Sequence, residues 1–100
     1  MANDLAIAHG SSPRVSVYPW SSGFGTKYSN PGTLPTNFAI NATFSPNAAH
    51  LAVGHNTSPN VTAYPFTVGT GFGTKYSDPG TLPGGTVDEV IFSPTTADIA

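Results

Sequence analysis

The hydrophobic positions of this chain alternate over short stretches, as they do in β-strands with one buried face. Leu5 and Ile7 alternate with alanines before His9, and the stretch from Leu51 to His55 repeats this arrangement. Ten prolines and eleven glycines leave no room for a helical period of apolar residues. The pattern therefore predicts an all-β protein made of short strands.

Three further kinds of strand are expected along the chain. Each alternating stretch runs through a polar turn into a strand rich in β-branched residues that ends in tyrosine. A half-exposed edge strand follows, with lysine on its outer face. A Pro-Gly pair then predicts a type II turn at Asn30 and again at Asp78, each leading to an apolar strand. The expected ranges are 15–18 and 61–64, then 24–28 and its counterpart ending near 76, then 38–44 and 87–92.

A long stretch of sequence occurs twice. Residues 23–35 and 71–83 are identical except that Asp78 replaces Asn30, and they lie 48 positions apart. The histidines His9 and His55 lie 46 positions apart, so two residues have been inserted before the second copy. A period in this range predicts stacked supersecondary units. Half of a 100-residue chain without cysteine cannot bury a separate core, so the units are expected to pack against each other.

The second unit resembles the repeat of a known family. Phe44-Ser-Pro-Asn-Ala-Ala-His-Leu-Ala-Val-Gly, followed by Val61-Thr-Ala-Tyr64, resembles the WD-repeat pattern of an inner strand ending in Phe-Ser-Pro, a Leu-Ala strand and a third strand ending in an aromatic residue. The resemblance covers almost the whole chain, which also looks like the highly regular propeller repeats of bacterial and phage proteins. It implies β-propeller blades, each a four-stranded antiparallel sheet.

The chain departs from the family pattern at the residues that name it. Tyr18-Pro19 and Tyr64-Pro65 stand where the Trp-Asp pair would fall, and no Gly-His precedes the inner strand. The buried hydrogen-bond tetrad of the family is therefore not carried over. In its place, the histidine of each unit, His9 or His55, is expected to pair with the tyrosine of the same unit.

The division of strands among blades predicts association between copies. Residues 1–34 supply strands two to four of a split blade, residues 35–83 supply a complete blade and a crossover, and residues 84–100 supply only an inner strand. The first blade therefore lacks an inner strand, and the last inner strand lacks a blade. Both leave unpaired strand edges, which would be removed if that inner strand were donated to the next copy. Head-to-tail donation closes a homo-oligomeric ring, a trimer with six blades or, as we favour slightly, a tetramer with eight. The expected interface residues are Leu5, Ile7, His9, Val87, Val90, Ile91 and Phe92.

The two ends of the chain overlap in this alignment. Asp98-Ile-Ala100 corresponds to Asp4-Leu-Ala6. In a ring the two segments would compete for one site, so one of them is expected to fray. The overlap favours a two-repeat unit that has been excised from a longer array or engineered.

Composition and charge exclude several classes of partner. Three basic and five acidic residues give a formal net charge of −2, without a basic stripe that could bind nucleic acid or an anionic membrane. No apolar run approaches the roughly 18 residues of a membrane helix. The N-terminus has neither a basic start nor a long apolar run, so no signal peptide is expected.

Candidate chemistry is sparse, and no catalytic residue, metal or cofactor is expected. His9 and His55 have no carboxylate in their own strands and are interpreted as structural. His50 is placed in a turn and given no role. The glycine-rich stretch before Lys75 lacks the following helix that a phosphate loop requires.

Exposed aromatic residues leave one alternative function open. Aromatic and lysine side chains near the loop ends could stack on and hydrogen-bond to a sugar ring. The alternative to a structural self-assembling unit is therefore a multivalent recognition module for carbohydrate on a viral or bacterial surface. Its candidate ligand-binding residues are Trp20, Lys27, Tyr28, Lys75 and Tyr76.

Overall fold

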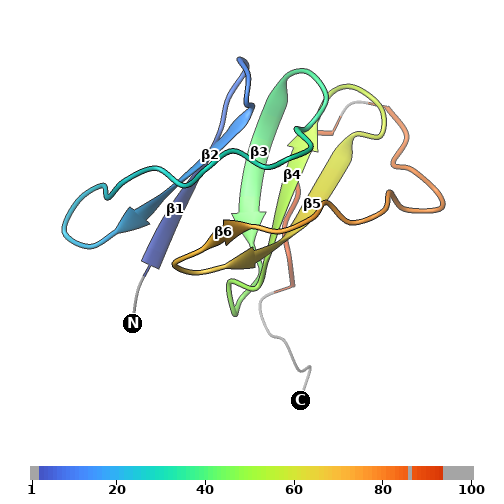
Figure 1. The fold of residues 1–100 in the computed structure, drawn as a ribbon. Coiled ribbons are helices and arrows are strands. Elements are labelled where there is room, and N and C mark those ends of the chain that lie inside the picture. The colour runs from blue at the N-terminus through green and yellow to red at the C-terminus, as the bar shows by residue number, and fades with distance from the viewer. Residues whose placement is uncertain (1–2, 86, 94–100) are drawn as a thin grey trace.

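The computed structural model describes residues 3–85 and 87–93, which contain six strands and no helix. The strands form two antiparallel sheets that lie side by side (Figure 1). The predicted all-β class is confirmed. The predicted overlap of residues 98–100 with residues 4–6 lies outside the described residues.

The first sheet contains two strands, β1 (Asn3–Ala8) and β2 (Val15–Trp20). The register places Ala6 opposite Val17 and Ala8 opposite Val15, so these residues share one face of the sheet. Both valines are fully buried, and the alanines pack against the same core. The other face of β1, with Leu5 and Ile7, is exposed.

The second sheet contains four strands in sequence order: β3 (Ala39–Phe44), β4 (His50–His55), β5 (Val61–Thr67) and β6 (Gly71–Phe72). All neighbouring pairs are antiparallel, as expected for this part of the chain. The register of β3 against β4 shifts between Ala39 and Asn41, which marks a bulge at Ile40.

The core lies between the two sheets. The largest fully buried side chains from the second sheet, Tyr64 and Leu51, belong to the same cluster as Val15 and Val17 of the first. The alanine face of β1 packs against this shared cluster, and β3 of the second sheet lies beside β1. Packing of one unit on the other supplies the burial that neither could supply alone.

The outer strands are shorter than the sequence predicts. β6 has two residues, and its counterpart in the first unit is a single bridge between Trp20 and Phe24. The backbone carbonyls of Pro19 and Pro65 still accept hydrogen bonds from the N–H groups of Gly25 and Gly73, with a nitrogen–oxygen distance of 2.7 Å in both units. Proline cannot return a hydrogen bond, because it has no N–H, so the outer ladder stays incomplete.

The expected type II turns are absent. Gly32 and Gly80, which would occupy the third turn position, do not have the positive φ that this turn requires. The segment after Tyr28 has to cross from the β2 side of the first sheet to β3 of the second sheet. An extended crossover achieves this, whereas a turn would reverse the chain.

Residues 87–93 do not form the expected strand. They run beside β3 and β4 of their own chain (Figure 1). A single strand is not stable without a neighbouring edge, and the described chain offers none at this position.

Candidate functional site

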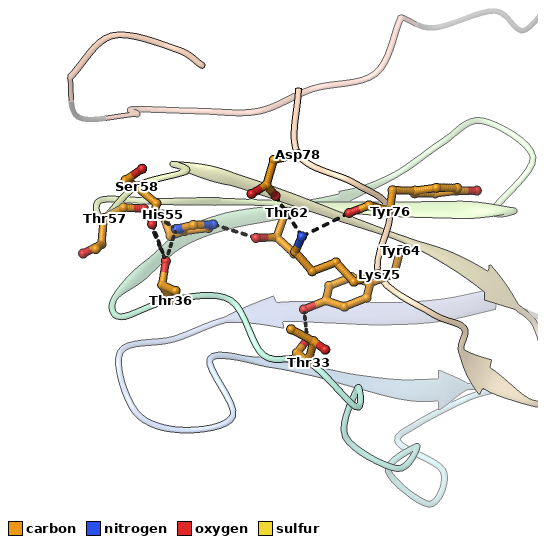
Figure 2. Close-up of polar contacts among 10 residues, drawn as sticks. All are labelled: Thr33, Thr36, His55, Thr57, Ser58, Thr62, Tyr64, Lys75, Tyr76 and Asp78. Atoms are coloured by element: carbon orange, nitrogen blue, oxygen red, sulfur yellow. Dashed lines mark hydrogen bonds and ion pairs between the residues drawn. The ribbon is translucent and has the colours of Figure 1, made fainter. Parts of the chain in front are cut away.

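The two repeated histidines are held by hydroxyl groups rather than by tyrosines. His55 is fully buried, and its Nε2 lies 2.8 Å from Thr62 Oγ1 (Figure 2). In the first unit, His9 Nε2 lies 2.9 Å from Ser16 Oγ. The expected histidine–tyrosine pairs are wrong because the register places Tyr64 opposite Leu51, four residues from His55 along β4.

The contacts of His55 fix its protonation. Its Nδ1 lies 2.9 Å from the carbonyl of Thr57, which can only accept, so Nδ1 carries the proton. Nε2 therefore accepts from the Thr62 hydroxyl. Burial lowers the pKa of His55 below its ordinary value of 6.5. Among the described residues, no group of three or more His, Asp or Glu side chains could hold a metal ion.

Both candidate lysines form hydrogen bonds with the crossover segment that follows each of them in the sequence. Lys27 Nζ lies 2.6 Å from Asn30 Oδ1, and Lys75 Nζ lies 2.8 Å from Asp78 Oδ1. Each ammonium group also donates to the carbonyl of the tyrosine that follows it. The lysines therefore fasten the crossover and do not present a free charge.

The candidate tyrosines reach across their own sheets. The Tyr28 hydroxyl donates to the Asp4 carboxylate, with oxygens at 3.1 and 3.2 Å, and the Tyr76 hydroxyl lies 2.7 Å from His50 Nδ1. Burial, with a smaller contribution from Asp4, raises the pKa of Tyr28. His50 begins β4 and has a role that the sequence interpretation missed. The signal was present, since Asp4 and His50 occupy the same position in the two units.

The candidate ligand-binding residues do not form one site. Trp20 stacks edge-on against Phe24, with ring centroids 5.0 Å apart. Lys75 lines a groove of about 460 Å³ beside Phe72, and Tyr76 lines a separate cavity of about 220 Å³. Recognition of a carbohydrate by these residues stays a prediction.

Each unit has a face that we call the leading face, and equivalent side chains on this face are exposed in the first unit but buried in the second. It carries Leu5 and Trp20 in the first unit, which are 39% and 40% exposed. Their counterparts 46 positions later, Leu51 and Phe66, are 0% and 3% exposed. The leading face of the second unit is buried because the first unit covers it.

We call the opposite face the trailing face. Its asymmetry is reversed on the part that includes β5 and the crossover after it, whereas Ala52 and Gly54 of β4 are buried, with Val87 and Val90 over Gly54. In the first unit Val17 and Pro31 are buried, whereas their counterparts Ala63 and Pro79 are half-buried and exposed. The 220 Å³ cavity lies on the uncovered part of the trailing face, and its lining residues are Val61, Ala63, Tyr76, Ser77, Asp78 and Pro79.

Comparison with known proteins gives no relative. No protein family, curated protein or solved structure matches this chain. No helix in the described ranges is long and apolar enough to cross a membrane. The features of the chain that bear on its function are the two faces, the open edge of β1 and residues 87–93.

The segment 87–93 is here called the donor segment, because the sequence predicts that its strand is donated to a neighbouring copy. Among the described residues, its side-chain hydrogen bonds come from Asn41. The Asn41 amide donates to the carbonyl of Val90 at 2.8 Å and accepts from its N–H at 2.9 Å. Val87 and Val90 also lie over Gly54, where a Cβ atom would come within 3.0 Å of Val87 Cγ1. The neighbouring Ile91 is 77% exposed.

Replacement of Asn41 with alanine should release the donor segment. Both hydrogen bonds to Val90 would be lost, so its amide hydrogen should exchange with solvent about tenfold faster. Hydrogen exchange followed by NMR measures this rate. Asn41→Asp is the matched control, because a carboxylate still accepts from the Val90 N–H. Equal exchange in all three proteins would show that Asn41 does not anchor the segment.

Proposed function

We propose that this chain is a structural unit that assembles with copies of itself into a closed β-propeller ring, without catalytic activity. Each copy would donate Val87–Phe92 to the open edge of β1 in the next copy. The observation that carries the proposal is the difference between β1 and β4. These strands have equivalent sequences, yet β4 is flanked on both edges and β1 pairs with β2 alone.

The sequence of the donor segment supports its role as the missing inner strand. Phe92-Ser-Pro repeats Phe44-Ser-Pro at the end of β3, 48 positions earlier. In the second sheet, Phe44 lies opposite Leu51 and Ala42 lies opposite Val53.

The same register, transferred to the junction between copies, makes a specific prediction. It would place Phe92 opposite Leu5 and Val90 opposite Ile7 of the next copy. These four residues are among those that the sequence predicts for the interface.

The position of the donor segment also supports the proposal. β3, the inner strand of the second sheet, lies beside β1 of the first. The donor segment lies on the other side of the second sheet, beside β3 and β4, and Val87 lies over Gly54. It would therefore reach the neighbouring copy while keeping its contact with Asn41.

The exposed leading face of the first unit and the partly uncovered trailing face of the second unit support head-to-tail closure. A leading face and a trailing face on one chain form a heterologous pair, which closes into a ring when the rotation per copy divides a full turn. Two sheets per copy would give six blades from three copies or eight from four, within the usual range of roughly four to eight.

Engineered disulfides test the strand pairing directly, because the chain contains no cysteine. With Ile7→Cys and Val90→Cys together, oxidation should link copies into covalent oligomers no larger than one ring, since directly opposed residues lie within disulfide range. Native mass spectrometry of the unmodified protein should show the same number of copies.

A shift of one residue provides the matched control. Ala6→Cys with Val90→Cys should not crosslink, because adjacent residues of a strand point to opposite faces. A stable monomer at micromolar concentration, or equal crosslinking of both pairs, would contradict the proposal.

A further inference from the structure

We infer that the cavity on the trailing face is a docking site for Tyr18 of a second copy, whose hydroxyl donates to the backbone carbonyl of Thr81. The inference deepens the proposed assembly and rests on its premise that copies pack head to tail. It concerns face-to-face packing, however, and does not depend on donation of the strand.

The template for this contact lies within the chain. Tyr64 is the counterpart of Tyr18, 46 positions later, and is the largest fully buried side chain among the described residues. It belongs to the cluster that includes Val15 and Val17, and its hydroxyl donates to the carbonyl of Thr33 at 2.6 Å (Figure 2). Tyr64, on the leading face of the second unit, thus packs against the trailing face of the first unit.

The cavity is the same surface one unit later. Val61 and Ala63 are the counterparts of Val15 and Val17, and Tyr76 to Pro79 repeat residues 28–31. Thr81 is the counterpart of Thr33. In the first unit Tyr64 clusters with the valines of this surface, whereas in the second unit the surface lines an open cavity of about 220 Å³.

The aromatic neighbours of Tyr18 fit the same partner. Within the chain, Tyr28 packs edge-on against Phe66, with centroids 5.2 Å apart. The counterparts of these residues are Tyr76 and Trp20, each about two-fifths exposed. Packing of Tyr76 from one copy on Trp20 of the next would bury both rings.

Charge does not oppose this contact. The cavity lining differs from its counterpart in the first unit at two positions, where Ala63 replaces Val17 and Asp78 replaces Asn30, and only the second change adds a charge. The Asp78 carboxylate is paired with Lys75 at 2.8 Å, so the incoming ring meets a neutralised pair. The remaining lining atoms belong to an aromatic ring, small apolar side chains, a serine and a proline.

Tryptophan fluorescence tests the docking site, because Trp20 is the only tryptophan of the chain. On assembly, its emission should shift to shorter wavelength, and acrylamide should quench it severalfold less. Tyr18→Phe should weaken assembly about tenfold through loss of one hydrogen bond. Tyr18→Ala should weaken it about 100-fold or more, and circular dichroism would verify that each variant keeps its strands.

The outcomes separate this inference from the proposed function. Strand crosslinking with Trp20 still fully quenchable would overturn the docking site and leave strand donation standing. Protected Trp20 in an oligomer that does not crosslink would support the docking site and overturn strand donation. A protein that stays monomeric throughout would overturn both.

Discussion

Replacing Tyr64 with alanine should lower the free energy of unfolding by about 3–5 kcal/mol, the usual cost of removing a large buried aromatic side chain. The ring is fully buried and packs edge-on against Phe72, with centroids 5.1 Å apart. Because small domains are stable by only about 5–15 kcal/mol, this loss would be a large fraction of the total stability. Urea unfolding followed by circular dichroism measures the loss.

Two variants separate packing from hydrogen bonding at this position. Tyr64→Phe removes only the bond to Thr33 and should cost about 1 kcal/mol. Tyr18→Ala makes the same change on the uncovered leading face, where the side chain is only half-buried, and should cost the monomer less than Tyr64→Ala. A loss below about 1 kcal/mol for Tyr64→Ala would mean that the two sheets are not held together through this residue.

The strands could be predicted because their signal is local. The alternation around Leu5 and Leu51 specifies β-strands with one bulky face, and both strands are present. The short outer strands also had a local signal in Pro19 and Pro65, whose missing N–H limits the ladder. The donor segment has the apolar pattern of a strand, but a strand also needs a partner edge, and that requirement is not local.

The polar contacts were less predictable, because side-chain reach depends on register. His55 and Tyr64 are close in the repeat pattern, yet the pairing of β4 with β5 separates them by four positions along the strand. The hydroxyl that His55 reaches belongs to Thr62, which no motif indicated.

Burial also depends on neighbours and not on the residue itself. Leu5 and Leu51 have the same local sequence pattern, and only the second is covered by another unit. The difference between the two leading faces therefore appears only in the structure.

Acidification should destabilise the protein through His55. The unfolded chain takes up the imidazole proton near pH 6.5, whereas burial lowers the pKa of His55 in the folded state. The stabilisation is therefore complete above pH 6.5 and is lost as the pH falls through the folded pKa, by up to about 1.4 kcal/mol per pH unit. Protonation of Nε2 would also displace the hydrogen bond that it accepts from Thr62.

A protein with one histidine isolates this effect. The chain has three histidines, so His9→Gln with His50→Gln leaves His55 alone. Urea unfolding at fixed protein concentration, between pH 7.5 and 5, should show a stability that falls with pH in this variant and falls much less after the further change His55→Gln. If the decline persists without His55, carboxylates and not the buried imidazole control stability in this range, because the unfolded state would then gain its protons elsewhere.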